Sequence, residues 1–375
     1  MWNAVAERSV PRGRVRSSAQ RATPSIVGTA TALPSHRYAQ RDLAKLACSF
    51  LPEGVAKQAA IERFFDHMGV EHRFLALRAE RYSALNGLAS RNDAWIEAAL
   101  GLGERVVRSL LDEVGLRAED ISLLATTTVT GIAVPSLDAR LMNCIPFSRS
   151  LKRLPLFGLG CLGGAAGIAR VADYLRGAPT EAAILLSVEL CSLTFQPHDG
   201  SIANIVSTGL FGDGASAVLL VGSAHPLAST ARVRVRGSRS AFFAKTERVM
   251  GWDVVDSGFK VVLSSDVPRL VREHVPAALD SFLAEHELTR DHIDAWVVHP
   301  GGPKVIDAME ESLDLPRGTL AATRESLASV GNLSSSSVLF LLDRMLRAGP
   351  LTPGAHGVMM AMGPAFCAEM VLLQC

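Results

Sequence analysis

The sequence predicts an α/β protein built from two duplicated halves, with helices and sheet packed in layers. Short apolar runs alternate with amphipathic segments along the chain, a pattern typical of α/β folds with parallel strands. The chain also resembles itself, because a shift of 171 positions carries Gly160-Cys161-Leu162 onto Gly331-Asn332-Leu333. This period is far too long for a solenoid repeat, so we interpret it as the duplication of a whole domain.

The first half contains both kinds of element that a layered fold needs. Runs of consecutive apolar residues are typical of strands buried on both faces of a sheet, and longer amphipathic segments of helices that cover it. We expect strands over 25–30, 121–128, 183–188 and 215–221, and helices over 41–49, 55–68, 92–114 and 165–175. Gly177 and Pro179 follow the last of these helices as stop signals.

The second half is expected to begin in the stretch 222–240, where Gly, Ser, Pro and Arg replace the apolar pattern. Valines alternate with arginines over 232–236, which predicts an exposed strand. A helix is expected over 267–286, and buried strands over 295–298 and 357–362. The predicted organisation is thus an N-terminal segment 1–24, a first half 25–230 and a second half 231–375.

The composition excludes several classes of protein. Hydrophobic residues make up 48% of the chain and charged residues 20%, which is sufficient for a large core. The formal net charge is +1, so a nucleic-acid partner is not expected. No apolar run approaches the roughly 20 residues of a membrane span. The six cysteines show no metal-type spacing, which favours free thiols in a reducing, cytoplasmic compartment and no bound metal.

The N-terminal segment 1–24 is rich in Arg and Ser and contains a single acidic residue, Glu7. Such a composition cannot bury enough apolar surface to order itself, so we expect disorder. An Arg-rich segment poor in acidic residues is also compatible with organelle targeting, and the sequence leaves this alternative open.

Three residues are candidate catalytic residues, because each stands at the end of a strand or the start of a helix in one of the two duplicated halves. Cys161 begins a helix among small residues, where the macrodipole favours the reactive thiolate. His299 leaves its strand before Pro300-Gly301-Gly302, and Asn332 heads the second helix. An imidazole N–H and an amide NH₂ together form a neutral two-donor site for a developing enolate. The alternatives are a packing cysteine, a buried histidine satisfied by backbone and an ordinary helix N-cap.

Four spaced motifs resemble those of the type III polyketide synthases, the chalcone-synthase-like branch of the thiolase-fold condensing enzymes. The resemblance runs from about Ser25 to the C-terminus and implies a thiolase-like fold of layers αβαβα. The motifs are Gly160-Cys161-x-Gly-Gly, His299-Pro-Gly-Gly-Pro303, Gly331-Asn332-Leu-Ser-Ser-Ser-Ser-Val338 and Leu210-Phe211-Gly-Asp-Gly-Ala215.

By this resemblance Cys161 accepts the acyl group, while His299 and Asn332 promote the decarboxylation of malonyl-CoA for an iterative Claisen condensation. Phe211 matches the aromatic gatekeeper between the CoA tunnel and the cavity. Arg63 matches a cation on the CoA phosphates, but His67 stands where a second Lys is usual. The resemblance further implies CoA thioesters as small-molecule partners, no cofactor, no metal and a homodimer.

The starter unit is predicted from a second set of residues. Val261 stands where plant relatives carry a second gatekeeper Phe, and the segments around Thr130 and Cys191 resemble bacterial alkylpyrone and alkylresorcinol synthases. In that subgroup the positions of Thr130, Val134 and Cys191, together with Thr194 nearby, line a tunnel for a fatty acyl tail. Burial gains about 0.8 kcal/mol per CH₂, so the resemblance favours a medium- or long-chain acyl-CoA starter. The alternative is that Thr130 and Cys191 are ordinary packing residues.

Three other functions stay open at this point. A malonyl-primed, tetrahydroxynaphthalene-type synthase would differ in the mass of its product. An initiating ketoacyl synthase would require malonyl on a carrier protein, although the four serines after Asn332 favour the polyketide branch. A non-catalytic scaffold of the same fold is less compatible with three retained reactive residues.

Overall fold

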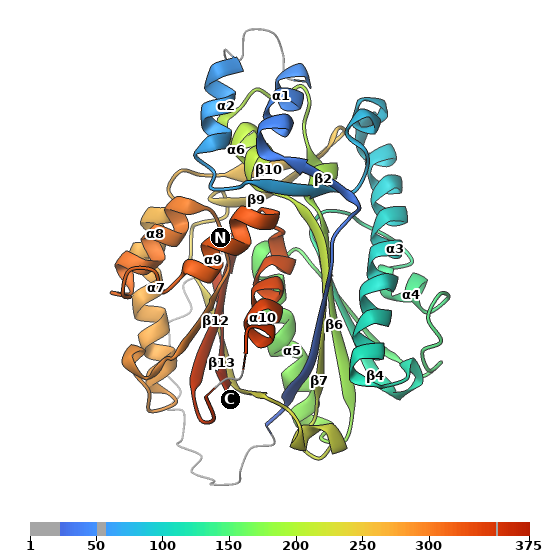
Figure 1. The fold of residues 1–375 in the computed structure, drawn as a ribbon, viewed down its shortest axis with the longest axis vertical. Helices are drawn as coiled ribbons and strands as arrows, with labels where there is room; N and C mark the ends of the chain where they lie inside the picture. The colour runs from blue at the N-terminus through green and yellow to red at the C-terminus, as the bar shows by residue number, and fades with distance from the viewer. Residues whose placement is uncertain (1–22, 51–57, 350–351) are drawn as a thin grey trace, which may run out of the picture.

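One continuous mixed sheet forms the frame of the protein in the computed structural model, which describes residues 23–50, 58–349 and 352–375 (Figure 1). In spatial order its strands are β11 (Ala295–Val298), β12 (His356–Gly363), β13 (Cys367–Gln374), β8 (Val233–Phe242), β1 (Ser25–Ala32), β7 (Asp213–Val221), β6 (Ala182–Leu190), β4 (Ile121–Thr128) and β5 (Lys152–Phe157). Both chain halves contribute to this sheet, and they meet at β1 and β8.

The strand order shows the duplication directly. Read outward from the centre, β1-β7-β6-β4 in the first half corresponds to β8-β13-β12-β11 in the second. In each half the two outer strands of this series pair in parallel, whereas the inner pairs are antiparallel. The predicted duplication is therefore confirmed, but the sheet is mixed where the sequence suggested parallel pairing.

Helices complete five layers. The two helices α5 (Gly163–Gly177) and α10 (Ser337–Arg347) lie side by side between the two halves of the sheet and share one apolar core with strands of both halves (Figure 1). The helix α3 (Gly87–Val114) covers the outer face of the first half. The outer face of the second half is covered by α7 (Val267–Ala284), α8 (Pro303–Ser312) and α9 (Ala321–Val330). This arrangement is the predicted αβαβα layering.

Two glycines allow the central helices to approach each other. A Cβ on Gly163 would lie 3.1 Å from Cβ of Ser335, and one on Gly164 would lie 2.8 Å from Cγ1 of Val338. A Cβ on Gly163 would also lie 2.5 Å from Oγ1 of Thr127. Real Cβ atoms essentially never come within 3.0 Å of a neighbour, so only glycine fits at the start of α5. The close approach brings the beginnings of α5 and α10, and the residues just before them, into one region.

A smaller set of elements covers one end of the sheet, at the top of Figure 1. The set consists of β2 (His36–Ala39), α1 (Gln40–Phe50), α2 (Gln58–Asp66), β3 (His72–Leu75), α6 (Ile202–Leu210), β9 (Met250–Val255) and β10 (Gly258–Leu263). The sequence missed β2, β3, β9 and β10, since none exceeds six residues and their burial is partial. It also missed α4 (Leu137–Leu141), α6, α8, α9, β5 and β13.

Several predicted elements differ in detail. The strand expected over 232–236 is not an exposed strand, because β8 occupies the middle of the sheet and its Val233 and Val235 are buried. Arg234 and Arg236, which alternate with these valines, are exposed. The long helix begins at Gly87 rather than at residue 92, and the one expected over 55–68 is α2 within the described residues. Residues 1–22 of the predicted disordered segment lie outside the described part.

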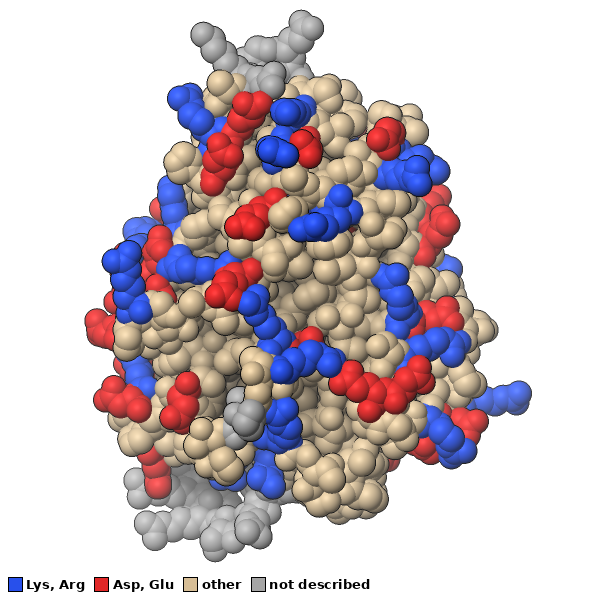
Figure 2. Space-filling model, in the orientation of Figure 1, with Lys and Arg blue, Asp and Glu red and all other residues tan. Residues whose placement is uncertain are grey.

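Basic and acidic side chains are interspersed on the face of the molecule that Figure 2 shows, with broad uncharged areas between them. Within the described residues, no helix is both long and apolar enough to cross a membrane.

Candidate active site

A cavity of about 830 Å³ lies where the two halves meet, and its wall contains Cys161, Phe211, Val261, His299 and Asn332. The three residues expected to do chemistry are thus brought together from separate parts of the chain. The volume falls within the range of about 300–1,000 Å³ that is usual for small-molecule sites. The hairpin of β9 and β10 contributes a further part of the wall, including Trp252.

Cys161 lies in a 3₁₀ turn, Gly160–Leu162, immediately before α5. Gly160 has a φ of +52°, and a Cβ at this position would lie 2.6 Å from Cδ of Pro364. Both conditions require glycine, because other residues are strained at positive φ and Pro364 leaves no space. The Gly-Cys pair of the sequence motif therefore holds the thiol at the cavity wall beside the turn Ser334–Ser336.

Burial controls the protonation of the thiol. Desolvation raises the pKa of Cys161 to about 12, and the charge of Glu189 adds to this effect. The Ser334 side chain lowers the pKa of the thiol, although its Oγ makes no hydrogen bond of good geometry within the described residues. Desolvation at the start of α5 therefore opposes the thiolate that the helix dipole is expected to favour.

His299 follows β11 and is 2% exposed. Its backbone N–H donates to the carbonyl oxygen of Met360 at 2.9 Å, which fixes the residue beside β12. Within the described residues neither ring nitrogen has a hydrogen-bond partner, so the alternative of a histidine satisfied by backbone does not hold. Burial lowers the pKa of His299 to about 3, and the imidazole is neutral by itself at physiological pH. A neutral ring carries one N–H that it can donate into the cavity.

Asn332 is oriented by bonds to its own chain. Its Oδ1 accepts from the backbone N–H of Ser334 at 2.8 Å and from Oγ of Ser337 at 3.3 Å. Because the oxygen is held on the protein side, the NH₂ group is the side of the amide left for the cavity. The backbone of Asn332 forms an isolated parallel bridge with Phe211, and Gly331 before it has a φ of +78°.

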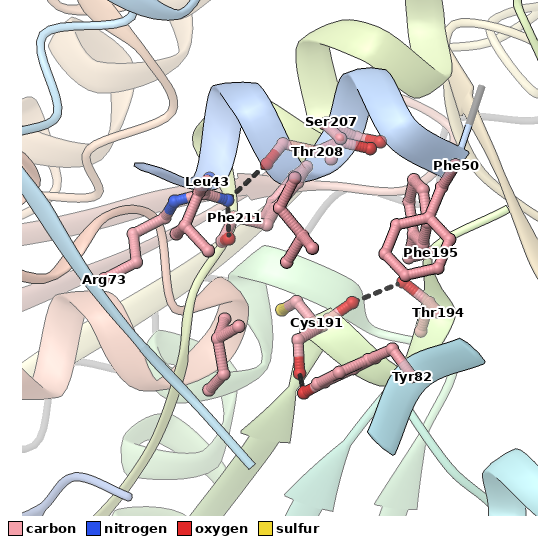
Figure 3. A pocket seen from close by; sticks show the side chains of 14 residues that line it. Leu43, Phe50, Arg73, Tyr82, Cys191, Thr194, Phe195, Ser207, Thr208 and Phe211 are labelled. Atoms are coloured by element: carbon pink, nitrogen blue, oxygen red, sulfur yellow. Dashed lines mark hydrogen bonds between the residues drawn. The ribbon is translucent and has the colours of Figure 1, made fainter. Parts of the chain in front are cut away.

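Phe211 lines both this cavity and a second, smaller one of about 70 Å³, and so lies between them. Figure 3 shows the side chains that line the smaller cavity. Cys191 and Thr194, two of the predicted tunnel residues, line the smaller cavity rather than the larger one. Burial raises the pKa of Cys191 well above its usual value, which disfavours a second reactive thiolate. Apolar side chains of α1, among them Leu43 and Phe50, form the opposite wall.

The other two predicted tunnel residues lie elsewhere. Thr130 is buried, but its Oγ1 is engaged by Glu189 Oε2 at 2.9 Å and by Trp95 Nε1 at 3.2 Å, and it lines neither cavity. Val134 is 92% exposed on the loop after β4. Within one chain neither Thr130 nor Val134 lines either cavity, since Thr130 belongs to a hydrogen-bond network and Val134 to the surface.

Basic residues lie at the part of the large cavity formed by α2 and α8. Arg63 and His67 come from exposed positions on or just after α2, and Lys304 from the first turn of α8. The sequence analysis missed Lys304, although it follows directly after the His-Pro-Gly-Gly-Pro motif. It also gave no role to Ser334, which lies within the Asn332 motif, and it missed Trp252 and Met362, which lie outside all four motifs. Among the described residues, no group of three or more His, Cys, Asp or Glu could hold a metal ion.

A duplicated αβαβα fold with a Cys, a His and an Asn around one cavity defines the class of condensing enzymes with a thiolase-like fold. Comparison with known proteins identifies the family. The family of chalcone and stilbene synthases matches over both of its parts, the N-terminal domain at residues 13–225 and the C-terminal domain at 234–375. The chain belongs to this family and is a type III polyketide synthase.

Individual relatives agree with this assignment. A 1,3,6,8-tetrahydroxynaphthalene synthase of Streptomyces peucetius subsp. caesius is 47% identical over 93% of each chain. A putative chalcone synthase of Bacillus subtilis is 34% identical over 92% of this chain and 97% of that one. The crystal structure of the 1,3,6,8-tetrahydroxynaphthalene synthase of Streptomyces coelicolor superimposes with a TM-score of 0.87 at 28% identity, covering 93% and 99% of the two chains.

Proposed function

We propose that the protein condenses malonyl-CoA units on Cys161, with His299 and Asn332 as the groups that stabilise the enolate. The observation that carries the proposal is that these three side chains line one cavity, and that the His299 ring nitrogens have no hydrogen-bond partner among the described residues. Loss of CO₂ from malonyl-CoA leaves an enolate, whose oxygen accepts hydrogen bonds from the imidazole and the amide. Neutral donors suffice for this charge, so we propose that neither a metal nor a cofactor takes part.

The condensation itself is a Claisen step. The enolate carbon attacks the thioester carbonyl on Cys161, the C–S bond breaks, and the sulfur leaves as a thiolate. The new chain, held on CoA, then returns to Cys161 and releases CoA. Burial disfavours a thiolate at Cys161 and an imidazolium at His299 when either charge is present alone. Proton transfer from Cys161 to His299 forms both charges together, and their mutual attraction makes this pair the least costly ionised form in the cavity.

We further propose that malonyl-CoA serves as the starter as well as the extender, with a fused aromatic product of the tetrahydroxynaphthalene type. The relative at 47% identity is named for this product. Thr130 and Val134 line neither cavity of a single chain, and the large cavity alone is of a size for a small polyketide.

A medium- or long-chain acyl starter, with an alkylpyrone or alkylresorcinol product, is the second candidate. The smaller cavity favours it, because Cys191, Thr194 and the apolar side chains of α1 lie directly behind Phe211. A movement of Phe211 would join the two cavities and give an acyl tail an apolar end site.

The experiment that decides is mass spectrometry of products from the purified protein given malonyl-CoA alone, or malonyl-CoA with a ladder of acyl-CoAs from acetyl to palmitoyl. We expect a product from malonyl-CoA alone whose mass does not change when acyl-CoAs are added. Products that appear only with long acyl-CoAs would establish the second candidate instead. A requirement for malonyl on a carrier protein would overturn both.

Two binding proposals accompany this function. We propose that Arg63, His67 and Lys304 bind the phosphates of CoA, since they place basic groups at one end of the cavity. We also propose a homodimer, because large apolar side chains are exposed after β4 and on β5, namely Ile132, Val134 and Phe157. Sedimentation of the wild type and of Val134→Asp tests the dimer, which the substitution is expected to weaken.

A further inference from the structure

A buried guanidinium lies beside the wall between the two cavities, and the chemistry described above gives it no part. Arg73, on β3, is 4% exposed, and in the part of the chain that the structure describes it forms no ion pair within hydrogen-bond distance of a carboxylate. Burial lowers the pKa of Arg73 to about 10, while the nearby charge of Asp213 raises it. The group is thus a buried cation, which is costly unless its donors are used.

The donors of Arg73 are used by the C-terminal end of α6 (Figure 3). Nη1 donates to the carbonyl oxygens of Thr208 and Phe211, the latter at 3.0 Å. Nε donates to Oε1 of Gln40 at 3.0 Å, and Nε2 of Gln40 donates to the carbonyl oxygen of Gly209 at 2.6 Å. The last carbonyls of a helix lack partners within the helix and lie at the negative end of its dipole. Arg73 and Gln40 together therefore cap α6 at the point where Phe211 follows.

The side chain of Arg73 also packs against the backbone next to Asn332. The backbone N–H of Asn332 donates to the carbonyl oxygen of Leu210 at 2.9 Å, and Phe211 and Asn332 are bridged in parallel. A Cβ on Gly331 would lie 3.1 Å from Cγ and 3.2 Å from Cδ of Arg73, so the arginine stem packs directly on this glycine. Arg73 thus contacts both segments whose side chains meet in the large cavity.

We propose that Arg73 is a positioning residue, which holds Phe211 as a closed wall between the two cavities and keeps the backbone of Asn332 in the same rigid unit. The proposal rests on the polyketide synthase reaction but not on the identity of the starter. Without the guanidinium, the carbonyls of Thr208 and Phe211 lose their donor and the end of α6 loosens. The ring of Phe211 is then free to move toward the smaller cavity. This movement changes the cavity volume that is available to the growing polyketide chain.

The first test is the accessibility of Cys191, which lines the smaller cavity behind Phe211. We expect iodoacetamide labelling of Cys191, measured by peptide mass spectrometry, to rise about tenfold or more in Arg73→Met, since removing a buried donor frees the carbonyls that it held. Arg91→Met is the matched control. Arg91 is also 4% exposed, and it donates to the carbonyl oxygens of Leu193 and Leu85 at 3.4 Å, not to the end of α6. Because Leu193 lies in the same 3₁₀ turn as Cys191, Arg91→Met shows how much labelling rises when only that turn is loosened. Labelling of Cys375 reports general unfolding in both variants.

The second test is a double-mutant cycle with Phe211→Ala, read as the distribution of product chain lengths. If Arg73 acts through Phe211, the double variant gives the product distribution of Phe211→Ala alone, whereas Arg91→Met adds no change in either background. We expect the KM for malonyl-CoA in Arg73→Met to stay within about twofold while kcat falls, because the arginine touches no substrate.

The proposal is overturned if Arg73→Met and Arg91→Met give the same Cys191 labelling, or if the product shifts of Arg73→Met and Phe211→Ala add independently. Should Arg73→Met fail to fold, Arg73→Lys and Gln40→Met replace it, and an absence of any change in both would equally overturn the proposal. If the wild type forms no polyketide from any CoA thioester, the proposed function fails, while the labelling of Cys191 still decides the role of Arg73.

Discussion

The beginnings of α5 and α10 are equivalent positions of the duplicated fold, yet they carry different chemistry. In each half a glycine with positive φ, Gly160 or Gly331, precedes the residue at the cavity, and a 3₁₀ turn leads into the helix. The first half places Cys161 within that turn, whereas the second places Asn332 just before it. The same backbone geometry places a side chain at the cavity in each half. Because that side chain is Cys161 in the first half and Asn332 in the second, each half contributes to a different step of the proposed reaction.

The two helix starts are also complementary in packing. The first half supplies glycines, and the second supplies serines that reach across to β6. The hydroxyl groups of Ser335 and Ser336 lie 2.8 and 2.7 Å from Oγ of Ser187, and Ser335 also donates to Glu189. All four residues are fully buried. The two equivalent helix starts therefore form a single site although they differ at only a few positions. The start of α10 contributes polar contacts, and the start of α5 contributes glycines that leave space for them.

Removal of the nucleophile is the strongest test of this division. We expect Cys161→Ala to abolish polyketide formation, by on the order of 10⁶-fold as for other removed nucleophiles. The variant should still release CO₂ from malonyl-CoA, because the second half retains both enolate donors. Mass spectrometry of products and a coupled assay for CO₂ measure the two activities. A loss of decarboxylation as large as the loss of product would show that the halves do not divide the reaction.

The converse change is made in the second half. We expect Asn332→Asp to lower decarboxylation by about 100–1,000-fold, the usual cost of one missing donor. The aspartate keeps an acceptor for the Ser334 N–H and the Ser337 hydroxyl, so the local fold is retained while the NH₂ group is lost. Circular dichroism checks the fold. Unchanged decarboxylation in a folded variant would remove Asn332 from the chemistry.

The pH dependence of Cys161 alkylation tests how the halves share a proton. Burial raises the pKa of this thiol to about 12, so below that pH the thiolate fraction is small. In His299→Ala no base remains to take the proton, and we expect the labelling rate to rise about tenfold per pH unit between pH 7 and 10. The wild type should label faster at pH 7 and show a flatter profile. Identical profiles would indicate that His299 does not stabilise the thiolate.

A substitution at the helix contact has the smallest expected effect. A Cβ on Gly164 would collide with the carbonyl oxygen of Ser335, so we expect Gly164→Ala to cost about 1–3 kcal/mol of stability and to lower activity by separating the two helix starts. Gly177→Ala is the control, since nothing lies within 4 Å of a Cβ there. Thermal unfolding measures both, and equal shifts would mean that the contact does not hold the halves in register.

Much of this comparison could be predicted from the sequence, because the duplication repeats a short motif that contains glycine at a backbone position only glycine tolerates. The buried strands were visible for the same reason, as runs of apolar residues. The sequence could not show that Val134 lies on the surface, since exposure depends on how a loop leaves the sheet. It also could not show how deeply Cys161 is buried, which raises the pKa of its thiol against the effect of the helix dipole. The sequence did not single out Arg73, because most of its partners are backbone carbonyls, and contacts with the backbone do not depend on residue type.

The seam between the halves has one further consequence. Only Ser25 and Ile26 of β1 pair with β8, so the backbone ladder is nearly interrupted in the middle of the sheet. A polypeptide cut in the loop between β7 and β8 would leave each fragment with its own strands, but its central helix would lack the apolar contacts that the other half provides. The two fragments would behave as an obligate split pair, in which neither is folded until it has met the other.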